Sequence, residues 1–82
     1  YINAHGWLNE TLGTKKLCQI VNRTLHLNKM KDGVYAANEG YAIGWVHKKL
    51  HIPCCLLEYK APNALHTKDN VRMIREIIKA YA

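Results

Sequence analysis

The sequence predicts an α/β fold, a mostly parallel or mixed sheet with helices packed on its faces, as part of a three-layer α/β/α sandwich. Strand-like runs alternate with amphipathic segments along the chain, which is the order of elements in α/β proteins. The run at 52–59 is apolar almost throughout, as in a strand buried on both faces of a sheet. Hydrophobic residues make up 49% of the chain, which is enough to form a core and argues against disorder.

The N-terminal half begins with a predicted strand at 1–5 and continues into a predicted helix. Thr14 suits the N-cap of this helix, and Lys29 and Gly33 suit its end. Residues 5–13 form a predicted loop, because glycines bracket them and no helical period appears. The buried stripe of the helix consists of four apolar residues at helical spacing: Leu17, Ile20, Val21 and Leu25.

The C-terminal half contains a helix, a strand and a final helix. A short link at 34–37 leads to Asn38, which suits the N-cap of the first of these helices. Pro53 precedes the strand, whose firm part is 54–59. Thr67 suits the N-cap of the final helix. Two inward faces follow from the helical period: Ala42, Trp45, Val46 and Leu50 in the first helix, and Val71, Ile74, Ile78 and Tyr81 in the last.

The length of 82 residues predicts a single unit, 1–82, with only a small core. The few predicted strands cannot cover two helical layers, so we expect further strands. The chain also opens on a strand-like segment without an initiator Met or the layout of a signal peptide. We therefore expect these residues to be the C-terminal portion of a larger catalytic domain.

Charge and cysteine content limit the partners and the compartment. Lys and Arg number 12 against 6 acidic residues, so the net charge of +6 favours anionic partners without naming one. The apolar segments are far shorter than the roughly 20 residues that span a bilayer, which predicts no membrane contact. Three cysteines, two of them adjacent at Cys54 and Cys55, predict reduced thiols, which favours a cytoplasmic location.

Two strand ends carry residues that are able to do chemistry. His5 directly follows the first strand, and Glu58 stands near the end of the buried strand. Ligands of open α/β sheets bind at the carboxyl ends of strands, so the two are potential neighbours. A neutral imidazole is a common zinc ligand, and a nearby carboxylate can transfer a proton. The alternatives are a structural role for His5 and a solvated strand end for Glu58.

This arrangement resembles the zinc metallocarboxypeptidases, in which a strand-end His is followed by Tyr, Trp and a strand-end Glu. The resemblance places His5 as a zinc ligand, Tyr35 as a contact to the end of the substrate, and Glu58 as the general base, with Trp45 between the last two. It implies a zinc cofactor, a peptide substrate and hydrolysis of the C-terminal peptide bond. It covers only the last third of that fold.

The chain also departs from the family pattern. The family has an upstream His-x-x-Glu that supplies two zinc ligands, followed by a substrate-binding Arg, and neither is present here. We therefore expect the other ligands to lie before residue 1, and we expect the chain to be inactive without the remainder of the catalytic domain or an oligomer partner. Lys60 lies two positions after Glu58, on the same strand face, and is a candidate substrate contact, with a solvated strand end as the alternative.

A small basic binding or assembly module is the alternative function. Four basic residues follow one face of the final helix and could meet the phosphates of a nucleic acid: Lys68, Arg72, Arg75 and Lys79. The same residues also fit an ordinary solvated helix face, which is the favoured interpretation over nucleic-acid binding. A protein partner could instead bind an exposed sheet edge, although that function gives Glu58 no role.

Overall fold

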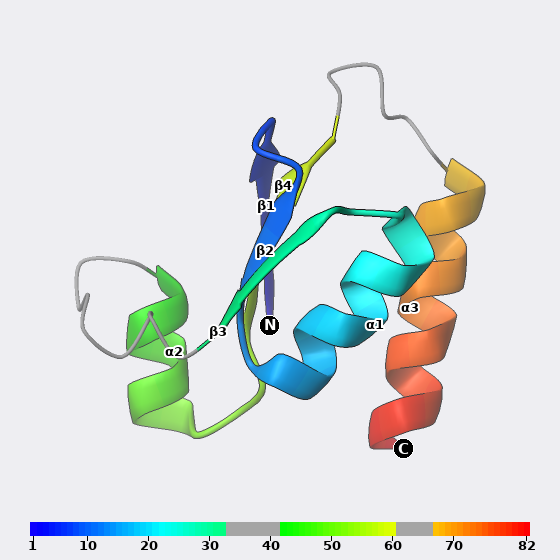
Figure 1. The fold of residues 1–82 in the computed structure, drawn as a ribbon. Helices are drawn as coiled ribbons and strands as arrows, with labels where there is room; N and C mark the ends of the chain where they lie inside the picture. The colour runs from blue at the N-terminus through cyan, green and yellow to red at the C-terminus, as the bar shows by residue number, and fades with distance from the viewer. Residues whose placement is uncertain (33–41, 61–66) are drawn as a thin grey trace.

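A computed structural model describes residues 1–32, 42–60 and 67–82. A four-stranded sheet forms the middle layer, with α2 on one side and the pair α1 and α3 on the other (Figure 1). The predicted three-layer α/β arrangement with a mixed sheet is therefore confirmed. None of the helices in the described ranges is long and apolar enough to cross a membrane.

The sheet consists of β1 (Ile2–Gly6), β2 (Glu10–Gly13), β3 (Lys29–Asp32) and β4 (Cys55–Tyr59), in the order β1-β4-β2-β3. Strand β1 is parallel to β4, β2 is parallel to β3, and β2 is antiparallel to β4. Strand β4 thus lies inside the sheet with a neighbour on each side. This position explains why its sequence is apolar on both faces.

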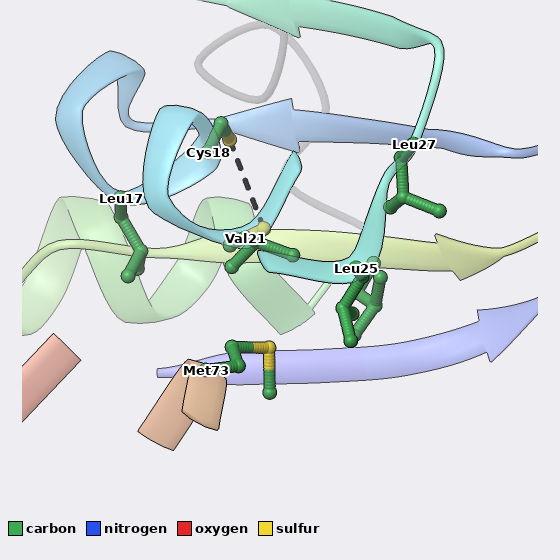
Figure 2. Close-up of a cluster of buried hydrophobic side chains, with 8 residues drawn as sticks. Leu17, Cys18, Val21, Leu25, Leu27 and Met73 are labelled. Carbon is green, nitrogen blue, oxygen red and sulfur yellow. Dashed lines mark hydrogen bonds between the residues drawn. The ribbon is translucent and has the colours of Figure 1, made fainter. Parts of the chain in front are cut away.

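The larger part of the core lies between the sheet and the helices α1 (Lys15–Leu25) and α3 (Thr67–Tyr81). The predicted stripe of α1 is buried throughout. Figure 2 shows Leu17, Val21 and Leu25 of α1 together with Met73 of α3 in this cluster. The full cluster is Leu17, Cys18, Val21, Leu25, Leu27, Cys55, Leu57 and Met73.

The smaller part of the core lies on the opposite face, under α2 (Ala42–Leu50). Ile43 of α2 is buried against Cys54, and three partly buried residues pack around them: Leu12, Val46 and Leu56. Leu56 therefore faces α2, whereas its neighbours in β4 face α1 and α3. Successive side chains of a strand point to opposite faces, so each residue of β4 faces either α2 or the pair α1 and α3.

The prediction of a loop at 5–13 is right for the bend at 7–9 but wrong for the rest, because β1 continues to Gly6 and β2 forms the interior of the sheet beside β4. Strand β2 is only four residues long, and tertiary pairing decides its conformation. Its buried Thr11 donates a hydrogen bond from Oγ1 to Oδ1 of Asn22 in α1, and Asn22 in turn donates from Nδ2 to the Lys29 carbonyl of β3. Asn22 thus joins α1 to both strands.

Helix α1 is shorter than predicted. It ends at Leu25, and His26 adopts a left-handed conformation with φ 57° whose N–H binds the Asn22 carbonyl. A residue in this conformation is a common helix stop. Lys29 consequently starts β3 instead of ending the helix, and the predicted positions Gly33, 34–37 and Asn38 lie outside the described residues.

The predicted inward face of α3 is wrong. Val71, Ile74 and Ile78 are 42%, 52% and 61% exposed, and Tyr81 is also exposed. Met73 is buried instead, with Ile77 packed beside it. The apolar residues of α3 cover a wider arc than one contact can bury, so the periodicity identified an apolar helix but not the side that meets the core.

The predicted inward face of α2 is wrong in part. Val46 is half-buried as expected, but Trp45, Leu50 and Ala42 are exposed, and Ile43 with Gly44 forms the buried contact instead. The buried side of α2 thus includes a glycine, which a pattern read from large apolar residues does not reveal.

The end of β2 is a close crossing that only glycine fits. Gly13 has φ 146°, and a Cβ placed there would overlap the backbone carbonyl of Cys54. The next residue, Thr14, accepts a hydrogen bond at Oγ1 from the N–H of Cys54 and donates its own N–H to the Cys54 carbonyl. Gly13 thus lets β2 and the start of β4 pair closely enough to form these bonds.

Replacing Gly13 with alanine is expected to lower the free energy of unfolding by about 2–4 kcal/mol, because the added Cβ forces β2 away from Cys54 and strains the backbone. Urea denaturation measures the change. Gly6→Ala is the matched control, since a Cβ at Gly6 meets nothing within 4 Å. Equal losses in the two variants would contradict the assigned crossing.

Candidate functional site

His5 and Glu58 lie directly opposite each other in the parallel ladder of β1 and β4. Directly paired residues of neighbouring strands point to the same face of a sheet. That face is the one covered by α2, because Leu56, two residues before Glu58, packs against the α2 cluster. The sequence-based expectation that these two strand ends are neighbours is thus met in the structure.

Glu10 of β2 is a third member of this group that the sequence did not reveal. It is the antiparallel register partner of Glu58, on the side away from His5. Paired residues of this kind have Cβ atoms about 4.5–5.5 Å apart, so the two carboxylates share one site. The segment Glu10-Thr11-Leu12-Gly13 alternates half-buried and buried residues, but four residues are too few to predict a strand by period alone.

Lys29 of β3 completes a row that crosses all four strands. It is the register partner of Glu10, so the order across the sheet is His5, Glu58, Glu10, Lys29, which we call the polar row. The two acids are adjacent, and each has a basic residue on its outer side. Like charges directly opposite each other destabilise a sheet, and the positive charge of Lys29 beside Glu10 reduces that cost.

Exposure differs along the polar row. His5 and Lys29 are exposed, whereas Glu10 and Glu58 are half-buried. The Oε2 atom of Glu58 is fully buried and accepts no hydrogen bond from any residue that the structure describes. A buried carboxylate oxygen without a hydrogen-bond donor is costly, so Oε2 of Glu58 is an unsatisfied acceptor.

The other two predicted site residues do not join the polar row. Tyr35 lies outside the described residues. Lys60 follows β4 in a bend, with an exposed side chain, so the strand alternation that put it on the face of Glu58 ends one residue earlier, at Tyr59. The turn after His5 contains a cis peptide bond between Gly6 and Trp7.

The polar row does not make a complete metal site. Within residues 1–32, 42–60 and 67–82, no group of three His, Cys, Asp or Glu side chains is arranged to hold a metal ion. His5 supplies one exposed imidazole, and the neighbouring carboxylates supply acceptor oxygens. This donor set fits one zinc ligand and an adjacent proton acceptor, but a catalytic zinc needs three protein ligands.

The cysteines are separate from the polar row. Sγ of Cys18 lies 3.7 Å from Sγ of Cys55 in the main core, where Figure 2 marks the contact with a dashed line. None of the three cysteines forms a disulfide. The hydrogen bond with Cys18 and burial together raise the pKa of the Cys55 thiol far above its ordinary value. Cys55 therefore stays protonated and serves packing rather than nucleophilic chemistry.

Comparison with known proteins gives no relative, since no family model, no curated protein and no solved structure matches the chain.

The raised pKa of Cys55 predicts that the protein loses stability in alkali. A thiol ionises near pH 9.0 in the unfolded chain but only at higher pH in the folded one, so the unfolded state binds fewer protons above pH 9.0. The free energy of unfolding is then expected to fall above that pH, by at most about 1.4 kcal/mol per pH unit for one thiol.

Urea denaturation between about pH 8 and pH 10, on either side of the ordinary thiol pKa, measures this slope. Cys55→Ala is expected to reduce it. Leu57→Ala, which removes core volume from the same strand and keeps every thiol, is expected to lower stability and leave the slope as it is. An unchanged slope in Cys55→Ala would refute the assignment.

Proposed function

We propose that this chain carries part of the active site of a zinc-dependent hydrolase of the metallocarboxypeptidase type, which removes the C-terminal residue of a peptide. The observation that supports the proposal is the register of β1 and β4, which sets an exposed imidazole beside a half-buried carboxylate at the carboxyl ends of two parallel strands. Ligands of α/β proteins bind at this end of a sheet.

Each of the two residues has a role that its position supports. His5 would hold the zinc through a ring nitrogen from the end of β1, and pairing with β4 fixes its backbone. The Glu58 carboxylate would take the proton of the attacking water and return it to the departing amine. Zinc, when bound, polarises the scissile carbonyl and makes the water more acidic.

The proposal needs residues beyond the polar row. A catalytic zinc needs two further protein ligands, and the reaction needs a group that binds the substrate carboxylate. Tyr35 and Lys60 are proposed to contact the substrate. Lys60 is exposed just past β4, on the same segment as Glu58. A cytoplasmic location is part of the proposal, supported by three thiols of which none forms a disulfide.

The test uses the protein encoded by the complete reading frame that contains these residues. It is expected to contain zinc and to hydrolyse an N-blocked dipeptide with a free C-terminal carboxylate, but not the corresponding amide. Glu58→Gln is expected to lower kcat/KM by about 10²–10⁴-fold and to leave the zinc content unchanged, because the amide cannot accept a proton.

His5→Ala is instead expected to lose both zinc and turnover. Metal analysis and the same peptidase assay measure the two losses. Glu76→Gln on α3 is the matched control for loss of a carboxylate, since Glu76 pairs with Lys79 on the opposite side of the molecule's core from the polar row. Loss of zinc in Glu58→Gln would contradict its assigned role. A wild-type protein without zinc or peptidase activity would end the proposal.

A further inference from the structure

Helix α3 presents a continuous apolar stripe to solvent. Val71, Ile74 and Ile78 are spaced at i, i+3 and i+7, so they lie on one side of the helix, and all three are exposed. We call these residues the α3 stripe. Contiguous exposed apolar surface is one of the features of interaction sites on folded proteins.

The contacts of α3 show which of its sides are already used. Toward the sheet, Met73 enters the core and Asn70 accepts a hydrogen bond from the Tyr59 hydroxyl. Toward α1, Arg72 donates to the Thr24 carbonyl and Lys16 donates to the Ala80 carbonyl. The α3 stripe therefore lies on the remaining side, away from both α1 and the sheet.

The sheet beneath α3 also ends on that side. Strand β1 is an edge of the sheet formed by the described strands, with β4 as its neighbour. Helix α1 contacts β2, β3 and β4, whereas Ile77 of α3 packs with Ile2 of β1 against the same core cluster. Among the described elements, the sheet thus ends at β1 and the helix layer on this face ends at α3.

Charge indicates the kind of helix that fits. The two acids of α3 already pair with its own bases, Asp69 with Arg72 at 3.4 Å and Glu76 with Lys79 at 3.5 Å. Lys68 and Arg75 remain as exposed charges on the same helix as the stripe. A second copy of this chain would bring the same basic residues and a net charge of +6, so repulsion disfavours self-association.

We propose that the α3 stripe docks an amphipathic helix of a protein partner, with an apolar stripe flanked by Asp and Glu. Its apolar residues cover Val71, Ile74 and Ile78, and its acidic residues lie next to Lys68 and Arg75. This interaction is independent of the proposed hydrolysis and does not need zinc or an intact Glu58.

The test uses the protein encoded by the complete reading frame and a synthetic amphipathic peptide of about five helical turns, with Leu along one stripe and Glu on both flanks. Fluorescence anisotropy is expected to show binding that weakens with added salt, and NMR shift changes are expected at the α3 stripe. Ile74→Ser is expected to raise the Kd by at least about tenfold, as is usual when an apolar anchor at the centre of an interface is truncated.

Ile52→Ser is the matched control, because Ile52 lies between α2 and β4 and is 40% exposed against 52% for Ile74. It is expected to leave the Kd unchanged, and a peptide with Lys in place of Glu is expected not to bind. Three outcomes would overturn the proposal: equal binding of both peptides, equal weakening by Ile52→Ser, or a wild-type dimer that Ile74→Ser converts to a monomer. Binding of duplex DNA that competes with the peptide, and that Ile74→Ser leaves unaffected, would also overturn it.

Discussion

The pairing of β4 with a strand on each side is the constraint on which the rest of the structure depends. Strand β4 is parallel to β1 and antiparallel to β2, and its alternate side chains enter both parts of the core. Leu57 packs β4 against α1 and α3, while Leu56 packs it against α2. The same register places His5 and Glu10 on either side of Glu58. Stability and the candidate site therefore share one cause.

The elements that the sequence predicted well are those with a long pattern. Helix α1 has four apolar residues at helical spacing, and all four are buried. Strand β4 has a continuous apolar run that only an interior position satisfies. In contrast, β2 and β3 have four residues each, and their conformation comes from pairing with distant parts of the chain. Local sequence contains little of that information.

The candidate site was predictable to the same extent. A residue at the end of a parallel strand has a known position relative to other strand ends, so His5 and Glu58 could be paired from sequence. Glu10 could not, because its place depends on an antiparallel register that no local pattern specifies. Likewise, the sequence does not show which part of the wide apolar arc of α3 faces the core. In the structure Met73 is buried there and Ile74 is exposed.

The most direct test of this account is the register of β1 against β4, measured by interstrand amide and Hα NOEs in solution. The account predicts contacts that place His5 opposite Glu58, and Glu58 opposite Glu10 on the other side. A shift of β1 by one residue would move His5 to the opposite face of the sheet from Glu58. That result would contradict the polar row and remove the structural basis of the proposed hydrolase.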